Sequence, residues 1–275
     1  METKKTSKKL TRVQGGETPV TENVQSTFVP TDESKGKATR LRVIAIILWV
    51  LAIAAQIGAI SLILKTPINM LWTIVLIAMD LILVVIGSVL WKKSNRFDPA
   101  SEQKKFLFFM QNQLGAVVSF IAFLPLIIFI FTNKNMSGKQ KGILGGIAVV
   151  ALLIAGVSGV DFNPPSVEQY TEQIKRVEWL NSGNDSIFWT KSGTKYHLYE
   201  DCSYINTSKT TEIFKGTVPQ ARELKNITEL CSRCEHRAIT EKGLNEADYN
   251  QNGEKIAETV ALTDSIETDS VEDMQ

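Results

Sequence analysis

Residues 195–202 of this 275-residue chain read KYHLYEDC, and residues 231–234 read CSRC. The chain holds only three cysteines and two histidines, and all of them lie between His197 and His236. Thiol and imidazole groups are the ligands that zinc prefers in proteins, so their concentration in one short segment indicates a metal site. This segment and four apolar runs that precede it decide what kind of fold the sequence predicts.

Four apolar runs set residues 43–160 apart from the rest of the chain. Their only charged residue is Asp80. A helix needs about 20 apolar residues to cross a bilayer, a length that the first three runs reach and the fourth approaches. Soluble helices of this length keep a polar face, which these runs lack. The sequence therefore predicts four transmembrane helices, with three spans and a re-entrant or interfacial fourth segment as the alternative. The runs are Val43–Leu64, Met70–Trp91, Phe106–Phe131 and Ile143–Val160.

The predicted fold is an α-helical integral membrane protein with four transmembrane helices, followed by a small α+β domain of the zinc-ribbon kind. Residues 1–42 are basic, and we expect them to form a disordered tail. Residues 161–186 form a helical connector, and residues 187–240 form the metal-binding domain. Residues 241–275 carry ten acidic residues and two lysines, a composition that predicts a disordered acidic tail.

The connector is expected to contain a short amphipathic helix at 167–180. Pro164 and Pro165 end the preceding helix, and Ser166 with Gln169 has the spacing of a helix-capping pair. Beyond the connector, the pattern predicts strands at 187–190, 195–197 and 211–214, and a helix at 218–224 whose N-cap is Thr217.

Four residues of the metal-binding domain form two pairs of candidate ligands. His197 and Cys202 are one pair, and Cys231 and Cys234 are a closer one. Three cysteines with one histidine are a common tetrahedral ligand set for structural zinc. A domain of about 55 residues buries little apolar surface, so a bound metal supplies stability that burial does not. We predict zinc at these four residues. His236 is the weaker candidate, since it follows Cys234 by only two positions.

Other uses of the cysteines fit less well. Three cysteines cannot all pair as disulfides within one chain. A redox CxxC motif is expected at a strand-to-helix turn of a thioredoxin-like βαβ unit, which this sequence does not predict.

Residues 188–234 also resemble a known family. They read FWTKSGTKYHLYEDCSYINTSKTTEIFKGTVPQARELKNITELCSRC, and the YHxxxxC and CxxC spacings, together with the aromatic residues, resemble the small zinc domain related to the metal-binding domain of the DNA-repair protein Ada. Such domains recur in bacterial surface, nuclease-associated and membrane proteins. In the Ada domain four cysteines bind zinc and one thiolate accepts a methyl group from DNA. Because His197 stands in place of one cysteine, the resemblance does not imply that activity here.

Asp80 lies near the middle of the second apolar run. An ionisable residue at that depth is costly and is by default a candidate for function. One interpretation is an ion or proton path. The other is that Asp80 holds helices together through a hydrogen bond to Gln56, Gln111 or Gln113, which would form a polar site within the membrane.

The positions of Lys and Arg predict that both ends of the chain lie in the cytoplasm. Basic residues concentrate on the cytoplasmic side of membrane spans. With the N-terminus inside, eleven of them flank the membrane inside and four outside. The alternative is an extracellular zinc domain, which the three lysines in residues 132–142 and the exported relatives of this domain favour. The inside set is Lys35, Lys37, Arg40, Arg42, Lys92, Lys93, Arg96, Lys104, Lys105, Lys175 and Arg176.

These features predict a multi-pass protein of the cell membrane whose structural-zinc module binds a protein partner or serves regulation. The alternative is a small transporter or channel subunit that uses Asp80. We expect no enzyme, because no Gly-rich phosphate loop, HExxH or GxSxG motif is present. Nucleic acid is not an expected partner, because residues 187–242 carry nine basic against seven acidic residues, a weak excess.

Overall fold

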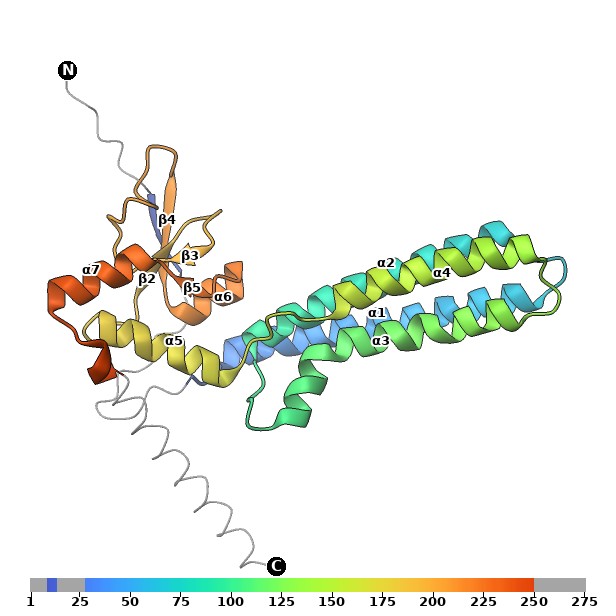
Figure 1. Ribbon diagram of the computed structural model, residues 1–275, viewed down its shortest axis with the longest axis horizontal. Helices are drawn as coiled ribbons and strands as arrows, with labels where there is room; N and C mark the ends of the chain where they lie inside the picture. The colour runs from blue at the N-terminus through green and yellow to red at the C-terminus, as the bar shows by residue number, and fades with distance from the viewer. Residues whose placement is uncertain (1–8, 14–27, 250–275) are drawn as a thin grey trace, which may run out of the picture. The chain divides into compact units, whose positions relative to one another are not determined.

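The computed structural model describes residues 9–13 and 28–249 of the chain. Contacts divide these residues into two compact units. The helical unit comprises residues 28–171, and the C-terminal unit comprises residues 9–13 and 172–249. Figure 1 shows the elements of both units in the colours of their sequence order.

The helical unit contains four helices that are long and apolar enough to cross a membrane. They lie side by side in Figure 1, joined by short connections, and each of the four apolar runs forms one of them. The prediction of four membrane-length helices is therefore confirmed. The helices are α1 (Asp32–Leu64), α2 (Met70–Phe97), α3 (Lys105–Thr132) and α4 (Gly138–Gly159).

Small residues allow these helices to approach one another closely. A methyl group added at Gly159 would lie 2.5 Å from the backbone nitrogen of Ala116, and one added at Gly87 would lie 2.5 Å from the indole nitrogen of Trp49. Large apolar side chains such as Phe120 and Leu153 point outward instead and are more than half exposed. Close packing of small residues with apolar surfaces outside is the pattern expected of helices in lipid.

The start of α1 differs from the predicted disordered tail at 1–42. The helix begins at Asp32, where the Thr31 hydroxyl accepts a hydrogen bond from the backbone of Ser34. An ion pair of 2.7 Å between Glu33 and Lys37 lies along the next turn. The cap and the ion pair extend a helix that the apolar segment has already nucleated, because each added residue gains one hydrogen bond. Residues 1–8 and 14–27 of the predicted tail lie outside the described residues.

The C-terminal unit combines short strands with three helices. Its three-stranded sheet has the order β1-β4-β2, in which β4 pairs parallel with β1 and antiparallel with β2. Strands β3 and β5 form a separate parallel pair. The elements are β1 (Lys9–Arg12), α5 (Val167–Leu180), β2 (Ile187–Trp189), β3 (Lys195–Tyr196), β4 (Glu212–Gly216), α6 (Val218–Lys225), β5 (Glu229–Leu230) and α7 (Ser232–Lys242), of which α5 begins in the helical unit.

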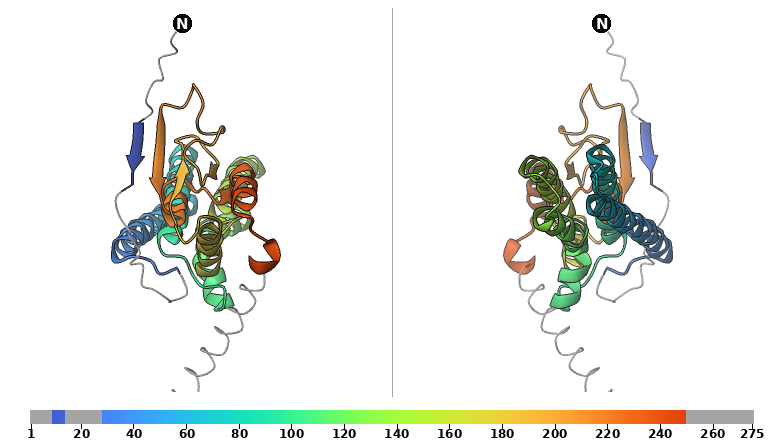
Figure 2. Two further views of the ribbon diagram at one scale, coloured as in Figure 1. Left: turned by 90° about the vertical axis from the view of Figure 1, so that its left-hand side faces the viewer. Right: turned by 90° about the vertical axis from the view of Figure 1, so that its right-hand side faces the viewer.

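Strand β1 comes from the predicted disordered tail and completes the sheet at the edge of β4. Lys9 pairs with Glu212 and Arg12 with Lys215, and the backbone N–H of Val13 donates to the Lys215 carbonyl over 2.9 Å. Figure 2 shows β1 alongside β4 in two views. A four-residue strand with exposed side chains carries little sequence signal, which is why the sequence did not predict it.

The core of the C-terminal unit forms between α5 and the strands. Val177 and Leu180 of α5 are fully buried together with Trp189 and Ile213. The helix at 167–180 thus has the bounds that the sequence predicts, but its second half belongs to the core and is more than a connector. The predicted strands and the helix at 218–224 also form, within two residues of their expected bounds.

The segment after residue 240 is helical at its start, unlike the predicted disordered tail. Helix α7 runs to Lys242, and the Tyr249 ring lies 5.1 Å from the Trp179 ring. Arg176 of α5 pairs with Glu235 of α7 over 2.7 Å and with Glu246, which follows α7, over 2.6 Å. Residues 250–275 of the predicted tail lie outside the described residues.

Candidate metal centre

His197 and Cys202 reach the centre from the loop that follows β3. The backbone of His197 is held by two hydrogen bonds of 2.7 Å with Phe188, one in each direction. Five residues later, the carbonyl of Cys202 accepts hydrogen bonds from the backbone of Ile205 and Asn206, which closes a tight turn. Both side chains therefore project from backbone that is fixed by its own hydrogen bonds.

Cys231 and Cys234 reach the centre from the start of α7. Cys231 is the N-cap of this helix, and its backbone N–H donates to the Tyr196 carbonyl over 2.9 Å. Cys234 lies one turn further on. The backbone N–H groups of Leu198 and Tyr199 form hydrogen bonds to the Cys234 sulfur. N–H donors of this kind favour the thiolate form, which is the form that binds metals.

The four side chains converge on one point. The possible ligand atoms of His197, Cys202, Cys231 and Cys234 all lie within 4.8 Å of one another, and all four residues are at most 5% exposed. The sulfur of Cys234 lies 3.6 Å from Nδ1 of His197. Ligand atoms around a tetrahedral zinc ion are about 3.5–3.8 Å apart, given bonds of about 2.0–2.3 Å. The cluster can therefore hold a metal ion after small side-chain movements.

Burial sets the protonation of the cluster. It lowers the pKa of His197 to about 4, which leaves the imidazole neutral and able to bind a metal. Burial also raises the pKa of the Cys234 thiol to about 12, although the hydrogen bonds from Tyr199 and Leu198 lower it. A divalent cation supplies the positive charge that stabilises buried thiolates, so these buried sulfurs are suited to binding a metal ion.

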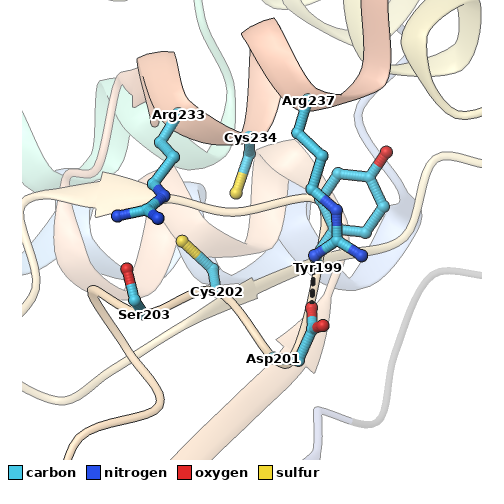
Figure 3. Close-up of a pocket in the computed structure, with 7 residues that line it drawn as sticks. All are labelled: Tyr199, Asp201, Cys202, Ser203, Arg233, Cys234 and Arg237. Atoms are coloured by element: carbon cyan, nitrogen blue, oxygen red, sulfur yellow. Dashed lines mark hydrogen bonds and ion pairs between the residues drawn. The ribbon is translucent and has the colours of Figure 1, made fainter. Parts of the chain in front are cut away.

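One side of the cluster opens into a pocket of about 300 Å³. Figure 3 shows the sulfurs of Cys202 and Cys234 at this pocket, with Arg233 and Arg237 of α7 beside them. Arg237 pairs with Asp201 over 2.8 Å, and its guanidinium lies 4.1 Å from the centre of the Tyr199 ring. The pocket gives solvent and small chelators a route to two of the four candidate ligands.

His236 is exposed on α7 and does not join the cluster, in agreement with its weaker standing in the sequence. The sequence did not reveal the supporting groups. The Tyr196 carbonyl and the amides of Leu198 and Tyr199 act through the backbone, which carries no residue-specific signal. Arg233 and Arg237 are four residues apart, and this spacing would have indicated one face of a helix if α7 had been predicted.

Asp80 is fully buried inside the helical unit, but none of the three glutamines contacts its carboxyl group through a hydrogen bond. The side-chain amide of Gln56 donates to the Ile121 carbonyl over 3.4 Å. Gln113 exchanges hydrogen bonds with the backbone of Asp161 over 3.0 and 3.3 Å. The expected polar site of Asp80 with Gln56, Gln111 and Gln113 does not form in the structure.

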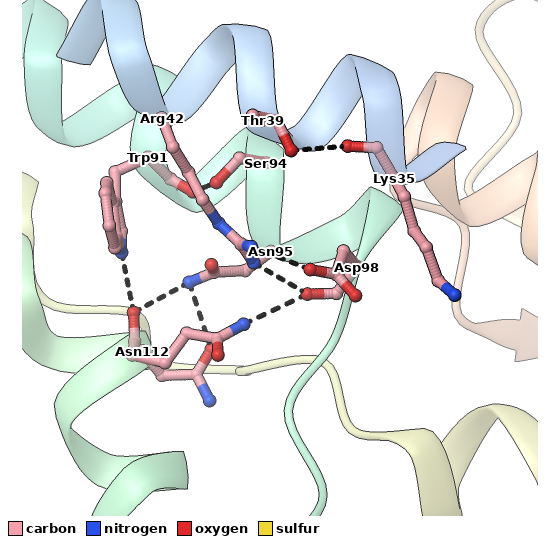
Figure 4. A network of polar contacts seen from close by, with 9 residues as sticks. Lys35, Thr39, Arg42, Trp91, Ser94, Asn95, Asp98 and Asn112 are labelled. Atoms are coloured by element: carbon pink, nitrogen blue, oxygen red, sulfur yellow. Dashed lines mark hydrogen bonds and ion pairs between the residues drawn. The ribbon is translucent and has the colours of Figure 1, made fainter. Parts of the chain in front are cut away.

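Gln111 belongs instead to a polar network with Trp91, Asn95 and Asp98, and Figure 4 labels these three partners. The side-chain amide of Gln111 donates to the backbone carbonyl of Asp98 over 3.0 Å. The backbone carbonyl of Gln111 accepts hydrogen bonds from the side chains of Trp91 and Asn95. The Arg42 guanidinium pairs with the Asp98 carboxylate over 2.7 Å. The glutamines of α3 lie within three turns of its start, and helix ends have backbone groups that such side chains satisfy.

Comparison of the chain with protein-family models, with curated proteins and with solved structures gives no match.

Proposed function

We propose that His197, Cys202, Cys231 and Cys234 bind one zinc ion. The observation that carries this proposal is the convergence of four buried ligand atoms, all within 4.8 Å of one another, from two segments that are far apart in sequence. Three sulfurs and one nitrogen are a ligand set that zinc takes in tetrahedral sites. The resemblance of residues 188–234 to the Ada-related zinc domain supports the same ion.

The role that we propose for this zinc is structural. Four protein ligands complete the tetrahedron and leave no position for an activated water, which catalytic zinc sites keep open. The ion would join the loop after β3 to the start of α7, two segments that also meet through the nearby β3–β5 pair and the Arg237–Asp201 ion pair. We therefore propose a metal-stabilised module without enzymatic activity.

The whole chain is proposed to be a multi-pass protein of the cell membrane that presents this module to a protein partner. Four helices are long and apolar enough to span the bilayer, and they would tether the module to the membrane surface. Small zinc-stabilised domains commonly serve as interaction modules, since metal supplies the stability and leaves the surface free to vary. The nearly balanced charge of the module argues against nucleic acid as the partner.

Both ends of the chain are proposed to lie in the cytoplasm. Pairing of β1 with β4 requires residues 9–12 and 212–215 to be on one side of the membrane, as an even number of spans also requires. The bias of Lys and Arg favours the cytoplasm as that side. Thiolate ligands persist there, since the compartment is reducing.

Elemental analysis of the purified full-length protein tests the metal site. We expect one zinc per chain, and loss of that zinc in Cys231→Ser. His236→Ala is the matched control, because it removes a nearby histidine outside the cluster and should retain the metal. A wild-type protein without stoichiometric metal, or a control variant that loses it, would contradict the proposal.

A further inference from the structure

A buried polar residue outside the metal centre is Asp80, the eleventh residue of the 28-residue helix α2. Its side chain has no exposure to the surface of the unit. Within the described residues, neither of its carboxyl oxygens has a hydrogen-bond partner, and no ion pair includes it. A polar group in such surroundings is costly, and its presence in a native structure calls for an explanation.

Helix packing does not explain this residue. Gly58 of α1 contacts Leu76 of α2, and Trp49 of α1 contacts Gly87 of α2, so residues 49–58 of α1 run alongside the part of α2 that includes Asp80. Gln56 lies within that part, yet its side chain donates to the backbone of α3. A carboxyl group that joins helices would use such a neighbour, as buried polar side chains in membranes do.

Asp80 belongs to a line of polar residues on the buried face of α2. Thr73, Ser88 and Asn95 lie seven or eight residues from their neighbours in this line, which is two helical turns, and all are fully buried. The hydroxyl oxygen of Ser88 and the side-chain oxygen of Asn95 also have no partner within the described residues. Side-chain oxygens without a hydrogen-bond partner therefore recur along α2 from Asp80 toward one end of the helix.

The line ends in the polar network of Figure 4. The Asn95 amide donates to the Asn112 side chain over 3.2 Å and to the Gln111 carbonyl over 2.9 Å. Ser88 packs closely against α3, because an added methyl group at Gly115 would lie 2.9 Å from the Ser88 oxygen. The buried polar positions of α2 thus extend from Asp80 to the network at the helix end, at intervals of about 10–12 Å.

We propose that Asp80 is a proton-binding site of the helical unit, and that its proton enters from the polar end of α2, on the side where Ser88 and Asn95 lie. The reaction is a reversible transfer from hydronium to a carboxyl oxygen, in which one O–H bond forms, another breaks and water is released. Among the described residues Asp80 belongs to no cluster of possible metal ligands, whereas a metal cation would need several further oxygen ligands. A proton needs none, and a neutral acid costs less in an apolar interior than an anion.

Such a site extends the function beyond that of the metal module. Buried carboxyl groups with a polar route to one surface serve as proton relays in membrane proteins. Asp80 could take up and release its proton regardless of whether the metal centre is loaded, because the two sites lie in different units.

Infrared spectroscopy of the full-length protein in lipid tests the proposal. A protonated carboxyl group has a separate carbonyl band that shifts when its proton is replaced by deuterium. We expect such a band in the wild type, a shift after transfer to D2O, and loss of the band in Asp80→Asn. Glu102→Gln is the control, since Glu102 is exposed and its removal should leave the band unchanged.

Two further variants make the test decisive. Asp80→Glu should keep a carbonyl band at a shifted frequency. This variant assigns the band to residue 80 if Asp80→Asn fails to fold. Ser88→Ala should slow the deuterium shift, because it removes a polar group on the proposed side of entry. The absence of an Asp80-dependent band, a band that does not shift in D2O, or an exchange rate that Ser88→Ala leaves unchanged would each overturn the proposal.

Discussion

The sulfur of Cys234 lies 3.6 Å from Nδ1 of His197, although 37 residues separate them in the chain. The contact follows from the parallel pair β3–β5, in which Tyr196 is opposite Leu230. The next residue on each strand, His197 and Cys231, therefore enters the same region, and the first turn of α7 returns Cys234 to it. The candidate metal centre is thus the point where the two ends of a 38-residue segment meet, so metal binding and folding should be linked.

Removal of the metal should unfold the C-terminal unit and leave the helical unit intact. The ligand-bearing segments are joined by the two-residue pair β3–β5 and by the exposed Asp201–Arg237 ion pair, which hold weakly without the ion. Hydrogen exchange measured by mass spectrometry before and after chelation should show loss of protection in residues 187–242. Helices α1–α4 are the internal control and should keep their protection. Unchanged exchange in residues 187–242, once elemental analysis has shown that the metal is gone, would refute this linkage.

Replacement of Arg176 by alanine should destabilise the C-terminal unit by about 1–3 kcal/mol, since it leaves Glu235 without its charged partner in a partly buried position. Arg176 also stacks 4.8 Å from Trp179 and 4.7 Å from Tyr249, so packing is lost as well. Urea denaturation monitored by hydrogen exchange measures the effect. Arg233→Ala is the matched control, because this arginine is exposed, and its change should stay within about 0.5 kcal/mol.

Two glycines of α4, Gly159 and Gly146, should respond differently to replacement by alanine. At Gly159 the new methyl group would lie 2.5 Å from the backbone nitrogen of Ala116, which should cost about 1–3 kcal/mol because the backbones must separate. At Gly146 nothing lies within 4 Å of the new group, so Gly146→Ala should be neutral. Thermal denaturation in detergent compares the two variants. Equal midpoints would mean that α3 and α4 do not pack as described.

Labelling of single engineered cysteines in intact cells tests the proposed topology. Asn135 lies between α3 and α4, and Lys191 lies in an exposed turn of the C-terminal unit. A membrane-impermeant maleimide should label Asn135→Cys directly and Lys191→Cys only after permeabilisation. Lys9→Cys should behave as Lys191→Cys does, because β1 pairs with β4. Labelling of Lys191→Cys from outside would place the C-terminal unit on the cell surface.

Several features of the fold could be predicted because they depend on local sequence. Four long apolar runs form four helices, each of which is long and apolar enough to cross a membrane. The helix at 167–180 was predicted from a capping pair and an apolar face, and the Ser166 hydroxyl does accept from the Gln169 backbone over 3.0 Å. The spacing of His197, Cys202, Cys231 and Cys234 predicted a set of residues that the structure brings together.

Other features depend on contacts that the sequence does not display. Strand β1 forms because the edge of β4 offers unpaired backbone groups, about 200 residues away in the chain. Helix α7 has only Cys231 as its N-cap and few apolar residues, so its pattern is weak. The expected link between Asp80 and the glutamines failed because Gln111 and Gln113 lie near the start of α3, whereas Asp80 lies in mid-helix.

X-ray absorption at the zinc edge of the purified protein tests the central claim most directly. If His197, Cys202, Cys231 and Cys234 hold the ion, the spectrum should show three sulfur atoms at about 2.3 Å and one nitrogen at about 2.0 Å, with no oxygen ligand. His197→Cys should convert this shell to four sulfurs. A bound water, or a shell with fewer than three sulfurs in the wild-type protein, would contradict a closed structural zinc site.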